Sequence, residues 1–118
     1  MKITEIEKIE EWESLKNKTT GSSEIIIFKY SPVCGISDSV EYDFSEWFSS
    51  LSENTPVRCV KINVIDSRPL SQHIAGELQV KHQSPQLIWL AKDGSVKWHA
   101  SHYDITPAKL TALLKAEP

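Results

Sequence analysis

One short segment combines residue types that could perform chemistry. Residues 28–37 read FKYSPVCGIS, so Cys34 follows an apolar run and Ser37 stands three positions after it. A cysteine in this context can be a nucleophile, a metal ligand or a packing residue. As a nucleophile, its thiolate would attack a disulfide and form a mixed disulfide. Because position 37 is a serine and not a second cysteine, that intermediate must await an outside thiol, which predicts a monothiol reaction.

To act as a nucleophile at neutral pH, Cys34 needs an environment that stabilises its thiolate, because a free cysteine with a pKa of about 8.5 is mostly protonated there. The residues after Cys34 have a helical pattern, and the unsatisfied N–H groups and positive dipole end of a helix N-terminus favour a thiolate. The Ser37 hydroxyl, one turn further on, could donate to the sulfur. Asp38 opposes both effects, since a carboxylate raises the pKa of a nearby thiol. We expect the first two to prevail if Asp38 faces solvent.

The second cysteine, Cys59, lies inside a predicted strand that reads VRCVKINVI. A packing residue is the expected interpretation and a resolving thiol is the alternative, because no turn or helix start would activate it. Lys61 is two residues further along the strand and therefore on the same side. It either favours the Cys34 thiolate or extends its ammonium group to solvent along the surface.

Four histidines raise the question of a metal site. His99 and His102 are three residues apart near a predicted strand end, and no third ligand is evident. We therefore expect no bound metal. Trp89 and Trp98 are interpreted as packing residues and not as a stacking platform.

Alternating helix and strand patterns predict a single α/β domain over residues 1–118. Helical spacing of apolar residues covers 6–17, about 34–51 and 68–78, and a Thr-Pro pair begins a last helix over 106–115. Strand patterns cover 24–30, 57–65, 85–91 and 96–101, with a brief strand at 2–4. A KDGS turn predicts that the last two strands form a hairpin. The order predicts a mixed four- or five-stranded sheet with helices on both faces.

This arrangement resembles a thioredoxin-like fold over most of the chain. Within that superfamily, FKYSPVCGIS together with SPQLIWLAKDGSVKWHASHYDIT resembles the monothiol bacilliredoxins of the YtxJ type, in which Cys-Pro-Ile-Ser replaces Cys-x-x-Cys. The resemblance implies reduction of mixed disulfides between proteins and the small thiol bacillithiol, with Cys34 and Ser37 as the catalytic pair. It also implies bacillithiol as co-substrate and no tightly bound cofactor. The sequence departs from the family pattern at Gly35, where proline is usual.

The resemblance further implies where substrates bind. The Ser84–Pro85 bond should be cis and face Cys34, which leaves the Ser84 backbone to pair with an extended client segment. A trans proline at the first residue of a strand is the alternative. The other expected substrate contacts flank the cysteine: Pro32, Val33 and Gly35.

The superfamily also bears on Lys61. In thioredoxins a lysine in this context pairs with a buried acid on the strand before the active site. Phe28 occupies the corresponding position here. Lys61 should therefore lack that partner, which leaves it available to tune the Cys34 thiolate.

Two other functions remain open. The CGIS segment also resembles the Cys-Gly-Phe-Ser motif of monothiol glutaredoxins, which would imply glutathione and iron–sulfur cluster carriage. Against this, the Gly-Gly and acidic segment that follows the cis-proline strand in those proteins is replaced by WLAKDGSVKWHASHYD. The second alternative is a non-catalytic thioredoxin-fold interaction module in which Cys34 takes no part in chemistry.

Composition narrows the partners. The net charge is −3, with thirteen Lys and Arg scattered among sixteen Asp and Glu, so no basic stripe suits nucleic acid. No apolar run approaches the roughly 20 residues of a membrane span. Two cysteines are too few for a disulfide framework. We therefore expect a cytoplasmic protein whose partners are a low-molecular-weight thiol and S-thiolated client proteins.

Overall fold

The computed structural model describes residues 1–33 and 35–115, with Ile36 described in its backbone alone. The strands are β1 (Ile3–Glu5), β2 (Glu24–Tyr30), β3 (Val57–Asn63), β4 (Gln86–Leu90) and β5 (Val96–Ser101). The helices are α1 (Ile9–Thr19), α2 (Gly35–Ser49), α3 (Arg68–Leu78) and α4 (Pro107–Lys115), with a 3-10 turn η1 (His102–Asp104).

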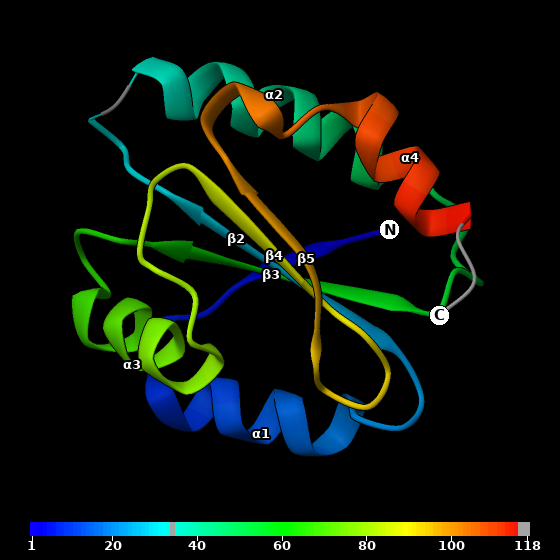
Figure 1. The fold of residues 1–118 in the computed structure, drawn as a ribbon, viewed down its shortest axis with the longest axis horizontal. Coiled ribbons are helices and arrows are strands. Elements are labelled where there is room, and N and C mark those ends of the chain that lie inside the picture. The colour runs from blue at the N-terminus through cyan, green and yellow to red at the C-terminus, as the bar shows by residue number, and fades with distance from the viewer. Residues whose placement is uncertain (34, 116–118) are drawn as a thin grey trace.

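The strands form one sheet in the order β1-β3-β2-β4-β5. The first three in this order are parallel, and β4 pairs antiparallel with both β2 and β5. Helices α2 and α4 cover one face of the sheet, and α1 and α3 cover the other (Figure 1). The predicted mixed sheet is confirmed in its five-stranded form.

Strand β2 is apolar along its length because both of its faces are covered. Ile26 and Phe28 pack beneath α2 and α4, while Ile25 and Ile27 pack against α1 and α3. The Phe28 ring stacks on Phe44 of α2 with centroids 4.7 Å apart. Since α2 follows the FKYSPVCGIS segment, this aromatic contact sets the height of the helix above the sheet.

The first helix begins later than its apolar spacing predicts. Ile6 is extended, and its N–H donates to the Lys61 carbonyl at 3.1 Å, which continues the pairing of β1 with β3. The Glu11 carboxylate then accepts the N–H groups of Glu7 and Lys8, each at 3.0 Å. The helix therefore starts at Ile9 and not at residue 6.

Strand β3 ends two residues earlier than its sequence predicts. The Asn63 side-chain oxygen accepts the N–H groups of Ile65 and Asp66, each at 3.0 Å. This local turn takes the backbone donors that a longer strand would use. The apolar pattern of VRCVKINVI did not reveal that competition.

The turn between β4 and β5 and the start of α4 form at the residues predicted for them. Gly94 has φ +90°, a conformation that glycine adopts at no steric cost, and it closes the predicted hairpin between β4 and β5. The Thr106 hydroxyl accepts the Lys109 N–H at 3.3 Å and caps α4 as predicted. Within residues 1–33 and 35–115, each helix is too short or too polar to cross a membrane.

Candidate active site

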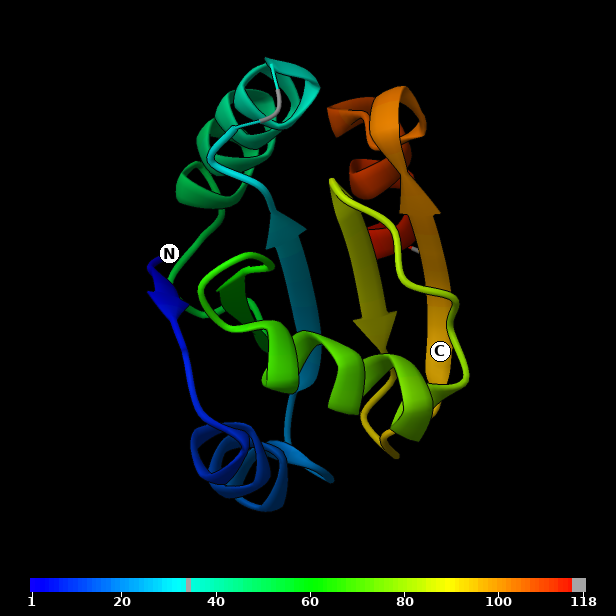
Figure 2. The same cartoon turned by 90° about the vertical axis from the view of Figure 1, so that its left-hand side faces the viewer.

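The candidate site lies where β2 runs into α2. Residues 31–33 connect the strand to the helix, which begins at Gly35. Figure 2 shows the end of β2, the first turn of α2, the start of β4 and η1 together at one end of the molecule. Cys34 itself lies outside the described residues, so its role as nucleophile remains a prediction.

The register of the sheet brings the proline to this end. Gln86 of β4 lies opposite Lys29 of β2, so Pro85 is level with Tyr30. The Ser84–Pro85 bond is cis, the isomer that the resemblance implied. The Pro85 carbonyl accepts the His102 N–H at 3.0 Å, which ties the start of β4 to η1. A client strand beside Ser84 would therefore lie next to the loop that follows β2.

Ser37 anchors that loop from within α2. Its side chain is fully buried, and its hydroxyl oxygen accepts the Ser31 N–H at 3.2 Å. The Ser31 hydroxyl in turn accepts the Val33 N–H at 3.4 Å. The proton of the Ser37 hydroxyl is not used in this contact. Its expected donation to the sulfur of Cys34 remains a prediction, because Cys34 lies outside the described residues.

Replacing Ser37 by alanine should lower the free energy of unfolding by about 1–2 kcal/mol, because the buried Ser31 N–H loses its acceptor. Urea unfolding of the purified protein measures the change. Ser39→Ala is the matched control, since Ser39 is exposed on the same helix. Equal stability of Ser37→Ala and Ser39→Ala would show that the Ser31–Ser37 hydrogen bond contributes nothing.

The expected substrate contacts beside the cysteine are solvent-facing. Pro32 and Gly35 are exposed, and Val33 is 82% exposed. A Cβ built on Gly35 meets no atom within 4 Å, so packing does not require glycine where the family usually has proline. Asp38 is also exposed, which is the orientation in which its carboxylate opposes a thiolate least. Substrate contact by Pro32, Val33 and Gly35 remains a prediction.

Lys61 has no acid opposite it on β2, but it pairs with an acid from α2. Its register partner on β2 is Phe28, as expected, and its ammonium group forms an ion pair with Glu41 of α2. The same ammonium lies 4.6 Å from the centre of the Tyr30 ring. Tyr30 donates to Glu5 at 2.8 Å, and burial together with this carboxylate raises the pKa of Tyr30 to about 12. Glu41 offsets part of the positive charge of Lys61. Stabilisation of the Cys34 thiolate by Lys61 remains a prediction, and the ion pair should weaken it.

Cys59 is a buried residue inside β3. It lies opposite Ile26 of β2. From Ile26, β2 continues for four more residues to Tyr30, which is about 13 Å along a strand, before residues 31–33 begin. A disulfide needs Cα atoms within about 7 Å. Burial raises the pKa of the Cys59 thiol well above its ordinary value, although the charge of Lys61 opposes this. These features support a packing role and not a resolving thiol.

A buried cation that the sequence did not reveal lies on the face of β2 that α1 and α3 cover. The Lys29 side chain is fully buried, and burial lowers its pKa to about 8. Its ammonium group donates to the Ser71 carbonyl at 3.0 Å and lies 3.4 Å from Nδ1 of His82. The only signal in the sequence was a lysine within the apolar run EIIIFKY. A lysine near a strand end usually reaches solvent, so that signal was weak.

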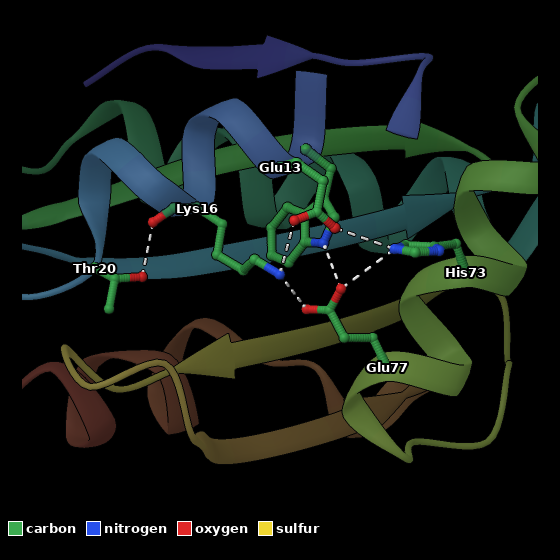
Figure 3. A network of polar contacts seen from close by, with 6 residues as sticks. Glu13, Lys16, Thr20, His73 and Glu77 are labelled. Atoms are coloured by element: carbon green, nitrogen blue, oxygen red, sulfur yellow. Dashed lines mark hydrogen bonds and ion pairs between the residues drawn. The ribbon is translucent and has the colours of Figure 1, made fainter. Parts of the chain in front are cut away.

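A polar cluster between α1 and α3 was also not predicted from the sequence. Nε2 of His73 lies 3.2 Å from a Glu13 oxygen and 3.3 Å from a Glu77 oxygen (Figure 3). These three side chains have metal-ligand chemistry, and their ligand atoms lie within 4.8 Å of one another. Lys16, however, pairs with Glu13 at 3.2 Å and Glu77 at 2.8 Å. The cluster is thus an ion-pair network that joins α1 and α3, on the face of the sheet opposite α2.

Comparisons with known proteins agree on family and fold. A family model described as monothiol bacilliredoxin BrxC matches residues 4–110. A solved protein with a thioredoxin fold superposes with a TM-score of 0.79 at 23% identity, covering 94% of this chain and 92% of that one. Reduced thioredoxin pre-protein from Schistosoma mansoni gives 0.73 at 16% identity, with coverage of 98% and 97%. Thioredoxin from Fasciola hepatica gives 0.70 at 18% identity, with coverage of 94% and 95%. At these identities the structures establish the thioredoxin fold alone.

Proposed function

Because the chain belongs to the monothiol bacilliredoxin family, we propose that it is a thiol-disulfide oxidoreductase that removes bacillithiol from protein mixed disulfides through Cys34. The observation that carries this proposal is the family match, which spans residues 4–110 and includes both Cys34 and Ser37. The buried serine supports the monothiol form of the reaction, because it occupies the position where a second cysteine would act.

The proposed reaction consists of two exchanges. In the first, the Cys34 thiolate attacks the bacillithiol sulfur of the mixed disulfide, the client thiolate leaves and takes up a proton, and Cys34 is left bonded to bacillithiol. In the second, another bacillithiol thiolate attacks the bound bacillithiol sulfur. The products are bacillithiol disulfide and the regenerated Cys34 thiolate. The incoming bacillithiol is the reductant, because its sulfur enters the disulfide product while the client sulfur leaves the mixed disulfide as a thiol, so no tightly bound cofactor is required.

Described residues around the loop support this chemistry. Ser37 fixes the loop through the Ser31 N–H, and Val33 offers an exposed apolar contact. The cis Ser84–Pro85 bond just before β4 supports pairing of the Ser84 backbone with an extended client segment. The partners in this proposal are S-thiolated client proteins and bacillithiol, with the cytoplasm as the compartment.

Intact-mass spectrometry tests the proposal. Reduced protein is exposed separately to bacillithiol disulfide and glutathione disulfide, with Cys34→Ala and Cys59→Ala alongside. We expect one bacillithiol adduct on the wild type and on Cys59→Ala, none on Cys34→Ala, and removal of the adduct by added thiol. Equal or greater labelling by glutathione disulfide would overturn the assignment of bacillithiol. No adduct on the wild type from either disulfide would remove the basis for an exchange enzyme.

Replacing Ser37 by cysteine should convert the monothiol site into a dithiol site. The new thiol would attack the mixed disulfide at Cys34 and release the small thiol, because an internal attack outpaces an external one. Intact mass after treatment with bacillithiol disulfide should then show a loss of two hydrogens and no stable adduct. A lasting adduct on Ser37→Cys would contradict the idea that the serine alone makes the reaction monothiol. Ser39→Cys is the matched control, on the exposed side of the same helix.

A further inference from the structure

The buried Lys29 ammonium faces uncharged acceptors. It donates to the Ser71 carbonyl in α3 at 3.0 Å and lies 3.4 Å from Nδ1 of His82. Among the residues that the structure describes, no carboxylate pairs with it. Burying a cation without an anion costs free energy, so the acceptors that face Lys29 are needed to stabilise its charge.

The contacts of His82 define which of its ring nitrogens carries the proton. Nδ1 lies 3.4 Å from Lys29 Nζ and 3.2 Å from the Ser71 hydroxyl oxygen. A lysine ammonium has three donors and no acceptor, so Nδ1 must supply a lone pair. These contacts favour the neutral tautomer of His82 that carries its proton on Nε2. Partial burial of the ring, then the charges of Lys29 and Arg68, lower the pKa of His82.

His82 belongs to the segment that leads into the candidate active site. Residues 79–84 connect the end of α3 to the cis Ser84–Pro85 bond and β4. Figure 2 shows this segment running from α3 to the end of the molecule where α2 begins. Two contacts hold it near its start: the Val80 N–H donates to the Ala75 carbonyl at 3.2 Å, and the Gln86 amide donates to the Lys81 carbonyl at 2.9 Å. His82 is the anchor closer to Ser84.

We propose that His82 is a positioning residue for the disulfide reaction: its neutral ring, docked on Lys29 and Ser71, holds the Ser84–Pro85 edge in the position that a client segment pairs with. This inference rests on the proposed function and extends it to residues outside the FKYSPVCGIS segment. Lys29 and Ser71 act through His82 and do not touch the reacting sulfur atoms.

The arrangement makes client binding sensitive to acid. Protonation of Nδ1 removes the lone pair that Lys29 and Ser71 use, and it places a second cation beside Lys29. The charged groups that act on His82 are Lys29 from β2 and Arg68 from α3, and both are positive. A protonated ring should therefore leave its site and release residues 82–84. The thiol chemistry of Cys34 would continue, but with a displaced docking edge.

Kinetics of a labelled peptide that carries a bacillithiol mixed disulfide test this role. The value of kcat/KM is measured between about pH 5 and pH 8 for the wild type, His82→Gln and Lys29→Met, with exposed His99→Gln as the matched control. Glutamine does not titrate, and methionine removes the buried charge. Because Cys34 titrates in every protein, its contribution cancels in the ratio of wild type to variant, and what remains reports the docking of His82 on Lys29.

We expect the wild-type kcat/KM at about pH 8 to exceed that of His82→Gln and Lys29→Met about fivefold or more, mainly through a lower KM, and this advantage to shrink as His82 protonates in acid. The ratio of wild type to His99→Gln should stay constant. Flat ratios for both cluster variants would overturn the positioning role.

Nitrogen-15 NMR of the wild-type histidines provides a second readout that requires neither activity nor a variant. At about pH 7.5 the His82 Nδ1 should give the resonance of an unprotonated imidazole nitrogen. Amide exchange of residues 82–84 should accelerate as that ring titrates. A protonated Nδ1 at this pH would overturn the inference even if the enzyme is active. If the NMR result is as expected but the protein reduces no mixed disulfide, the proposed function is wrong, and so is the role of His82 in that reaction.

Discussion

Replacing Cys34 by alanine should reduce the rate of mixed-disulfide reduction to that of free bacillithiol alone. Thiol-disulfide exchange needs a thiolate nucleophile, and the chain has one other cysteine. That residue, Cys59, is buried in β3 with its pKa raised well above the ordinary value. It cannot substitute, so we expect the largest functional effect of any single change. Release of a labelled client thiol, followed with and without the enzyme, measures it.

Cys59→Ala is the control for this experiment. It should keep the wild-type rate of exchange, although it loses some stability because a buried side chain is shortened. In the native wild type, iodoacetamide should modify one thiol quickly and the second only after unfolding. Exchange above the background rate by Cys34→Ala, or its loss in Cys59→Ala, would mean that the reactive cysteine has been misassigned.

Replacing Lys29 by methionine should raise the free energy of unfolding at pH 7 by about 1–3 kcal/mol. Burial lowers the pKa of Lys29 from 10.5 to about 8, and a shift of that size corresponds to about 3 kcal/mol at roughly 1.4 kcal/mol per unit. Loss of the hydrogen bond to the Ser71 carbonyl offsets part of this gain. Methionine has a similar unbranched shape, so packing on the α1 and α3 face should be kept. Urea unfolding measures the difference.

The pH dependence of this difference has a definite sign. The folded-state pKa of Lys29 is below its unfolded value, so the unfolded chain binds more protons between about pH 8 and 10.5. The contribution of Lys29 to stability therefore rises with pH through this window, and the advantage of the variant should shrink there. Tyr30 and Cys59 also titrate at high pH, but they do so in both proteins and cancel in the difference.

Exposed Lys92→Met is the matched control and should change stability little at any of these pH values. A Lys29→Met protein that is less stable than the wild type at pH 7 would contradict the prediction. It would mean that the hydrogen bonds of the ammonium group outweigh its burial cost. A constant difference between pH 8 and 10.5 would instead show that Lys29 keeps an ordinary pKa.

The sequence by itself predicted the type of chemistry and determined most of the fold. Position 37, three residues after Cys34, is a serine, and this restricts any exchange at the site to one thiol. Strand and helix patterns predicted the mixed sheet because β2 is a short apolar run, as expected of a strand covered on both faces, and the apolar residues of α2 repeat with the helical period. The start of α1 and the end of β3 differ from the prediction, because the side chains of Glu11 and Asn63 redirect backbone hydrogen bonds locally.

Only the tertiary structure decided which polar groups meet. Lys61 was expected to lack its partner, but parallel pairing of β2 with β3 and packing of α2 above them bring Glu41 to its ammonium group. Lys29 and His82 are 53 residues apart and meet because β4 lies beside β2 in a particular register. Local periodicity records which face of an element is buried. It does not record strand order or register, and those two quantities select the contacts between distant residues.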